Sequence, residues 1–194
     1  MGRDDSKAAV LGRTEDVWPE IFGALRAGID IAAHLHSTAG WDPQDDKHLY
    51  QHMIRRKAVE AFKGLSTEFD EDDDQSDAAL SMSGLMLRLE HDVIRIWHIT
   101  PLEIPKPGSK TKREFIAQPP SGQTALFDVR DLMHRLRRDD RNHLILRWTI
   151  QHHTITRFDL VRPSGVKKGK VVVDWQHDLR PLCMPPPVGA SPPA

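Results

Sequence analysis

Apolar positions recur at helical spacing in two segments near the start of the chain. The first covers residues 14–40, and Pro19 lies in what would be its first turn. The second begins at Asp42-Pro43, because aspartate caps free amides and proline is tolerated at the first helical position. It runs to about Phe62. Their apolar stripes consist of Val17, Ile21, Leu25, Ile29 and Ala32 in the first, and Tyr50, Ile54, Ala58, Ala61 and Leu65 in the second. The pattern predicts a helical hairpin whose apolar faces need a further partner.

From Leu80 onward the spacing of apolar residues is typical of strands. The spacing of apolar side chains is that of strands in two segments, residues 85–89 and 93–97, which flank Glu90-His91-Asp92. This pattern predicts a β-hairpin. The later elements are a short strand at 114–117, a third helix from Thr124, and strands at 143–150, 154–162 and 170–175. Gln151-His152-His153 falls where a hairpin between two of these strands would turn.

These elements predict an α+β fold with a single domain. An antiparallel sheet of about five or six strands would pack on the N-terminal helical hairpin and one further helix. The length of 194 residues suffices for one domain with tails. We expect the domain at 14–180, a flexible N-terminus at 1–13, an acidic linker at 66–78, and a Pro-rich disordered tail at 181–194.

Composition and motifs narrow the classes of function. No apolar run is long enough to span a membrane, and the charged N-terminus lacks the apolar core of a secretory signal. Cys183 is the only cysteine, so we expect no internal disulfide, no cysteine-based zinc site and a cytoplasmic location. Glycine-rich nucleotide-binding loops and nucleophile elbows are missing from the sequence, and we therefore expect no cofactor.

Two patterns resemble metal sites but lack required ligands. Asp70, Asp72 and Asp74 alternate as in a calcium loop, yet the glycine and glutamate that such a loop needs are replaced by Gln75 and Ser81. His48 and His52 are one helical turn apart, without the glutamate of a zinc protease motif between them. We therefore expect no metal site.

The charge distribution is uneven along the chain. Residues 68–77 carry seven carboxylates and no basic side chain, so the rest of the chain has a net charge of about +6. The basic loops at 106–113 and 167–170 offer Lys106, Lys110, Lys112, Arg113, Lys167, Lys168 and Lys170 as candidate ligands for an anion or a nucleic acid. The alternative is ordinary surface charge beside a solvated loop.

Two His-x-Thr tripeptides supply the only constellation that suggests catalysis. In a strand, residues i and i+2 lie on one face, so His98 would stand beside Thr100, and His152 beside Thr154. These motifs resemble those of the 2H phosphoesterases. The resemblance implies that the two histidines act as general base and acid on a phosphodiester and that the threonines bind phosphoryl oxygens. The alternatives are a His98 satisfied by its strand neighbours and a His152 that lies in a turn.

A second resemblance covers residues 142–165 and the loop PGSKTKREF at 107–115. Both are similar to segments of uncharacterised actinobacterial and phage-borne proteins, which implies a mobile-element, defence or regulatory context without naming site residues. The sequence thus favours a non-catalytic interaction or regulatory module with a protein partner. The alternatives are a 2H-like phosphodiesterase acting on a cyclic or linear phosphodiester, and a nucleic-acid or anion binder.

Overall fold

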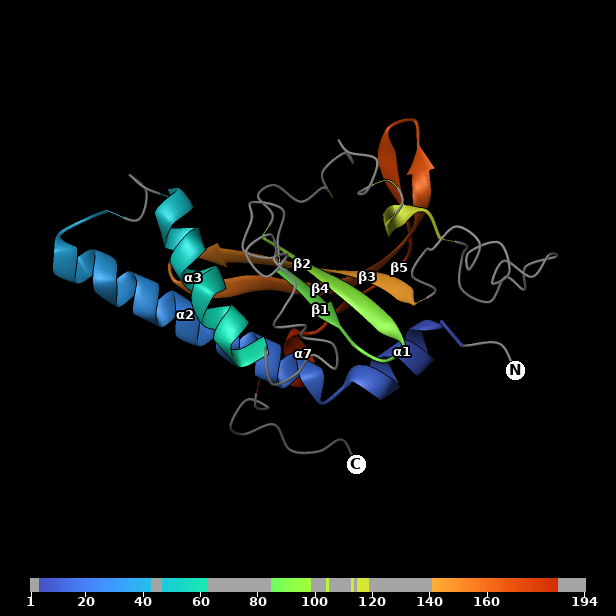
Figure 1. The fold of residues 1–194 in the computed structure, drawn as a ribbon, viewed down its shortest axis with the longest axis horizontal. Coiled ribbons are helices and arrows are strands. Elements are labelled where there is room, and N and C mark those ends of the chain that lie inside the picture. The colour runs from blue at the N-terminus through green and yellow to red at the C-terminus, as the bar shows by residue number, and fades with distance from the viewer. Residues whose placement is uncertain are drawn as a thin grey trace, which may run out of the picture.

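The computed structural model describes residues 4–42, 47–62, 85–98, 104, 113, 115–118 and 141–184. Its helices are α1 (Lys7–Thr14), α2 (Val17–Ala39), α3 (Lys47–Phe62) and α7 (Arg180–Cys183). Its strands are β1 (Leu85–Arg88), β2 (Asp92–His98), β3 (Asn142–Gln151), β4 (Thr154–Lys167) and β5 (Lys170–Asp178). The arrangement in Figure 1 confirms the predicted α+β class and the N-terminal helical hairpin.

The five strands form one sheet in the order β1-β2-β3-β4-β5. Three of the four neighbouring pairs are antiparallel, but β2 and β3 run parallel, in register from Asp92 beside Asn142 to His98 beside Trp148. The prediction of a purely antiparallel sheet is therefore wrong at this pair. Hydrophobic alternation fixes which face a residue occupies but carries no strand direction, and the connection from β2 to β3 is long enough for a crossover.

The helical hairpin covers one face of the sheet. Helix α2 runs along the strands, with α3 packed beside it (Figure 1). The main core lies between the helices and this face, and it contains Trp18, Ile21, Leu25, Ile54, Leu144, Trp148 and Phe158. Gly28 lets the two helices approach closely, because a Cβ there would lie 2.8 Å from the carbonyl oxygen of Ile54.

The N-terminal segment belongs to the fold from Lys7 onward, which corrects the predicted flexible N-terminus at 1–13. Ser6 caps α1 by accepting a hydrogen bond from the amide of Ala9 at 3.4 Å. Val10 is fully buried in the main core, and the Arg13 guanidinium bonds the Asp92 carboxylate at 2.7 and 2.8 Å. These distant contacts order a short helix that its own sequence stabilises only weakly.

The opposite face of the sheet carries a second, smaller cluster. Phe115 and Ile116 pack there on Ile145 and Val161. The strand predicted at 114–117 is wrong, because the described residues of this segment form a helical turn in which the amide of Ala117 donates to the carbonyl of Arg113 at 3.0 Å. Packing against the sheet outweighs the strand preference of aromatic and β-branched residues.

The C-terminal end also differs in part from the predicted tail at 181–194. Residues 181–183 belong to α7, and Cys183 packs against the main core. The acidic linker, the helix expected from Thr124 and residues 185–194 lie outside the described residues. No helix in the described part of the chain is both long and apolar enough to cross a bilayer.

Candidate functional site

The feature of greatest functional interest is the outer part of the β4–β5 hairpin, residues 163–173, which we call the arm. Pairing between β3 and β4 ends at Ile145 and Val161, whereas pairing between β4 and β5 continues to Lys167 beside Lys170. The arm is therefore a two-stranded ribbon that extends past the five-stranded sheet. Figure 1 shows its tip standing away from the body of the protein.

Irregular pairing at the base of the arm separates it from the rest of β4. The register shifts between Arg162 and Pro163 and again between Pro163 and Gly165. Such bulges bend a strand and increase its twist, and they are positions where a proline is tolerated within a sheet. The Gln118 amide holds the base by donating to the carbonyls of Pro163 at 2.8 Å and of His143 at 2.6 Å.

The tip of the arm is a tight turn built from Lys168 and Gly169. Both residues have positive φ angles, of 50° and 76°, as the two-residue turns of β-hairpins require. Lys167, Lys168 and Lys170 are all exposed at this turn. Neither strand of the arm contains an acidic residue, so the tip presents concentrated positive charge.

Exposed valines line the strands of the arm. Val166 is 41% exposed, and Val172 and Val173 are each 39% exposed. Residues of this kind normally face a core, and here they extend the apolar surface of the ribbon next to the lysines. A ribbon with a basic tip and apolar flanks is suited to contact a partner that combines negative charge with nonpolar surface.

A buried polar network fixes the position where the sheet ends and the arm begins. The Arg162 guanidinium, only 1% exposed, donates to Asn142 at 2.9 Å and to Asp174 at 2.7 Å. The Asn142 amide donates to Asp92 at 2.8 Å, and Asp92 in turn accepts from Arg13. The network links α1, β2, β3, β4 and β5, so the base of the arm is held on several sides.

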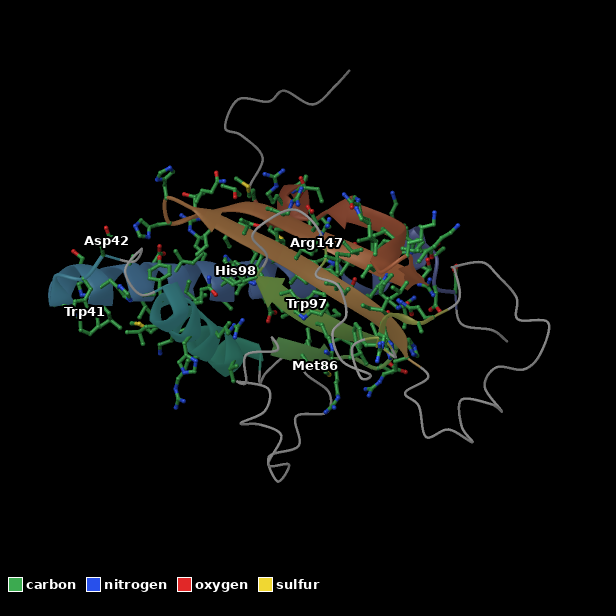
Figure 2. The ribbon with its side chains drawn as sticks, turned by 90° about the horizontal axis from the view of Figure 1, so that it is seen from above. Trp41, Asp42, Met86, Trp97, His98 and Arg147 are labelled. Atoms are coloured by element: carbon green, nitrogen blue, oxygen red, sulfur yellow. The ribbon has the colours of Figure 1, made fainter. Side chains whose placement is uncertain are left out.

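The first predicted catalytic residue, His98, lies at the end of β2 beside the helical layer (Figure 2). Its ring meets the Trp148 ring edge-on at a centroid distance of 4.7 Å. Burial, aided by the positive charge of Arg55, lowers the pKa of His98 from 6.5 to about 4. The imidazole is thus neutral near pH 7, and its buried Nε2 has no hydrogen-bond partner among the described residues.

The structure does not bring His152 to His98. The register places His98 beside Trp148, and His152 follows the end of β3, about 13 Å farther along the strand at about 3.3 Å per residue. His152 is exposed and sits with His153 in a turn at φ angles of 47° and 60°, as the predicted hairpin requires. Thr154 is exposed at the start of β4. Thr100 lies outside the described residues.

The predicted anion-binding residues divide into three groups. Lys167, Lys168 and Lys170 come together at the arm, as the sequence predicts for one loop. Arg113 is exposed in the helical turn that packs below the arm through Phe115. Lys106, Lys110 and Lys112 lie outside the described residues.

Sequence reasoning missed the arm itself, because Ser164-Gly165 reads as the end of a strand. The strand instead continues through these residues to Lys167. The available signal was the apolar run Val171-Val172-Val173, which follows Lys168-Gly169 after the single residue Lys170, since a glycine turn between two strand-forming segments is typical of a hairpin. Nothing in the local pattern predicted that Val172 and Val173, together with Val166 on the other strand, would remain exposed.

Comparison with protein-family models, curated proteins and solved structures finds no match to this chain. Within the described ranges, no group of three or more histidine, cysteine, aspartate or glutamate side chains is arranged to hold a metal ion. The functional argument therefore depends on the geometry of the chain alone.

Proposed function

We propose that the protein is a non-catalytic binding module that contacts double-stranded DNA through the β4–β5 arm. The observation that carries this proposal is the two-stranded ribbon past Val161, with Lys167, Lys168 and Lys170 exposed at its tip. Lysines bind phosphates and release counterions, which supplies most of the affinity of a sequence-independent contact.

The dimensions and chemistry of the arm fit a DNA groove. The major groove of B-form DNA admits a two-stranded β-ribbon, and thymine methyl groups and sugars offer apolar surface to side chains. Val166, Val172 and Val173 would meet this surface while the lysines hold the phosphates. The buried network at Arg162 fixes the base of the ribbon, which lowers the entropic cost of ordering it on DNA.

The test is a titration of the purified chain against a fluorescent DNA duplex of about 20 base pairs, read by anisotropy between about 50 and about 200 mM salt. The Lys167→Ala/Lys168→Ala/Lys170→Ala variant should weaken binding at least about tenfold at low salt. It should also reduce the slope of log affinity against log salt by roughly 2 to 3.

The matched control removes three exposed cations from the helices, as Lys7→Ala/Arg26→Ala/Arg56→Ala. This variant loses the same net charge, so a contact that is specific to the arm should leave it close to the unmodified chain. Equal losses in the two variants would overturn the arm as the contact, and binding to single-stranded DNA alone would overturn the duplex as the partner.

A protein partner is the second candidate, and the position of β5 at the end of the sheet order favours it. A strand with one paired side can accept an added strand through its main-chain groups. A second copy of this chain is the partner that can be tested directly. Sedimentation at increasing concentration should then show a dimer that Val172→Lys weakens, since a charge on an edge strand opposes such pairing.

The non-catalytic part of the proposal has its own test. His98 is neutral near pH 7 and packs against Trp148, and His152 is exposed in a distant turn, so these two imidazoles are not paired. Purified chain should leave cyclic and linear phosphodiesters intact. Turnover that disappears in His98→Ala would overturn this part.

A further inference from the structure

A pocket of about 470 Å³ lies at the C-terminal end of α2. This end of α2 and the arm lie at opposite ends of the protein (Figure 1), and Figure 2 labels Trp41 and Asp42 there. Its volume falls within the range of pockets that bind small ligands. The residues that line it are Ala33, Ser37, Gly40, Trp41, Asp42 and His153. The walls thus come from the end of α2, the residues that follow it, and the turn between β3 and β4.

Trp41 forms the exposed wall of the pocket. Gly40 ends α2 at a φ angle of 70°, and the amides of Gly40 and Trp41 donate to the carbonyls of Ser37 and His36 at 3.1 and 2.9 Å. This helix cap fixes the backbone of Trp41, yet its side chain remains 57% exposed. The indole is therefore held in place with much of its surface available to a ligand.

A cluster of aromatic rings packs against Trp41. The fully buried His36 ring contacts the rings of Trp41 and Tyr50 edge-on, at centroid distances of 5.8 and 5.2 Å. The Tyr50 hydroxyl shares a hydrogen bond of 2.8 Å with Nδ1 of His153. These contacts connect α2, α3 and the β3–β4 turn, so the residues that line the pocket are positioned without a ligand.

Three features of the pocket favour a positively charged ligand. The face of an indole attracts cations, and the C-terminal end of a helix carries a partial negative charge. The Asp42 carboxylate lies at the same place. Asp42 already makes a contact within the protein, but a carboxylate has about four lone-pair positions and can accept further hydrogen bonds.

We infer that this pocket binds a guanidinium group, which stacks on Trp41 and pairs with Asp42. A guanidinium is planar, carries five N–H donors and combines stacking with hydrogen bonds to a carboxylate, whereas an ammonium is a compact point charge. Ser37 also lines the pocket, and its hydroxyl can accept a further hydrogen bond.

The ligand experiment is a titration with N-acetyl-arginine methylamide, followed in ¹H–¹⁵N spectra. The chain has five tryptophans, and Trp41→Phe identifies the indole signal of Trp41. That signal should shift with a dissociation constant on the order of 1 mM, as expected for a small ligand at an open site. The citrulline derivative, a neutral isostere, should bind at least about fivefold more weakly, and so should the lysine derivative. Equal binding of either derivative would overturn the guanidinium assignment.

The variant experiment tests the two residues directly, with the backbone amide signals of Ser37 and Gly40 as the readout. Trp41→Ala and Asp42→Asn should each weaken binding roughly threefold to fivefold. Asp16→Asn is the matched control, because Asp16 is an exposed aspartate at the other end of α2 whose side chain makes no capping bond. Unchanged binding in both pocket variants, or equal losses in Asp42→Asn and Asp16→Asn, would overturn the site.

The source of the guanidinium is resolved by two further ligands. Binding of agmatine without a Gly-Arg-Gly peptide supports a free small molecule, and binding of the peptide supports an arginine side chain of a polypeptide. Failure of both would overturn the inference. The triple lysine variant of the arm should bind these ligands like the unmodified chain, so this site and the DNA contact can fail separately.

Discussion

The two halves of β4 differ in nearly every property although they belong to one strand. From Asp159 to Val161 the strand pairs with β3 on one side and β5 on the other, and Phe158, Leu160 and Val161 are fully buried. Beyond Pro163 the strand pairs with β5 and leaves Val166 exposed. The inner half contributes to the core, and the outer half presents a surface.

The contrast shows that one strand can supply core residues along one half and an exposed surface along the other, and the proposed function assigns binding to that surface. A two-stranded ribbon is only marginally stable alone, so the arm depends on its base for order. Substitutions at the tip should therefore leave the folded state intact, whereas substitutions in the inner half should destabilise all of it. Three predictions test this division, and a fourth extends the comparison to His98, a half-buried residue of β2; they run from the largest expected effect to the smallest.

Phe158→Ala should remove about 3–5 kcal/mol from the free energy of unfolding, measured by urea denaturation. Phe158 is fully buried and meets the Phe22 ring edge-on at 5.2 Å, so the substitution leaves a cavity in the main core. Val172→Ala, in the arm, should cost less than about 0.5 kcal/mol because Val172 is 39% exposed. Similar costs for the two variants would contradict the division of the hairpin.

Arg162→Ala should destabilise the fold by about 2–3 kcal/mol, because it leaves Asn142 and Asp174 without their guanidinium partner next to the core. Arg26→Ala on the exposed face of α2 is the control and should change stability by less than about 0.5 kcal/mol. Thermal denaturation of both variants measures the difference. A loss confined to the arm, without a lower global stability, would show that the network holds the ribbon alone.

The third prediction concerns how the free energy of unfolding depends on pH through His98. Its pKa is lowered to about 4 in the folded chain, mainly by burial, so between pH 6.5 and 4 the unfolded chain takes up a proton that the folded chain does not. Stability that is present at pH 7 is therefore lost as the pH falls through this window, by about 2–3 kcal/mol from this group.

Urea denaturation at pH 7 and at pH 4 measures this loss. His98→Leu should lose less stability on acidification than the unmodified chain, because the leucine does not titrate. His91→Gln, at an exposed histidine, should retain the full loss. An identical pH dependence in His98→Leu and the unmodified chain would contradict the role of burial.

Lys168→Asn should have the smallest effect on stability, and of the opposite sign. Lys168 has a φ angle of 50°, where asparagine is favoured over lysine, so the variant should gain about 0.5 kcal/mol. It should bind DNA more weakly, since one of the cations at the tip is lost. Denaturation and anisotropy measured on the same protein would separate the two effects, and a gain in both would contradict the proposed contact.

Local patterns predicted most of the elements correctly. The helical stripes located α2 and α3, and the alternation around Glu90-His91-Asp92 located the hairpin of β1 and β2. The positive φ angles at His152 and His153 confirm the turn predicted there. These features depend on residues close in sequence, which a periodicity captures.

Features that depend on distant residues were not predictable in this way. Helix α1 is fixed by contacts of Val10 with the core and of Arg13 with Asp92, and neither partner is near in sequence. The pocket joins Trp41 to His153 across the fold, and nothing in the local pattern pairs them. The exposure of the arm likewise follows from where the pairing of β4 with β3 stops, at Val161 beside Ile145.

The parallel pairing of β2 with β3 has a consequence for the rate of folding. Asp92 and Asn142 become bonded neighbours although they are 50 residues apart in the chain. Before such contacts can form, the chain must lose the entropy of closing a long loop, and folds rich in distant contacts cross their transition state slowly. Helix α2 and the β4–β5 hairpin join nearby residues, so we expect them to form early and the central strand pair to limit the folding rate.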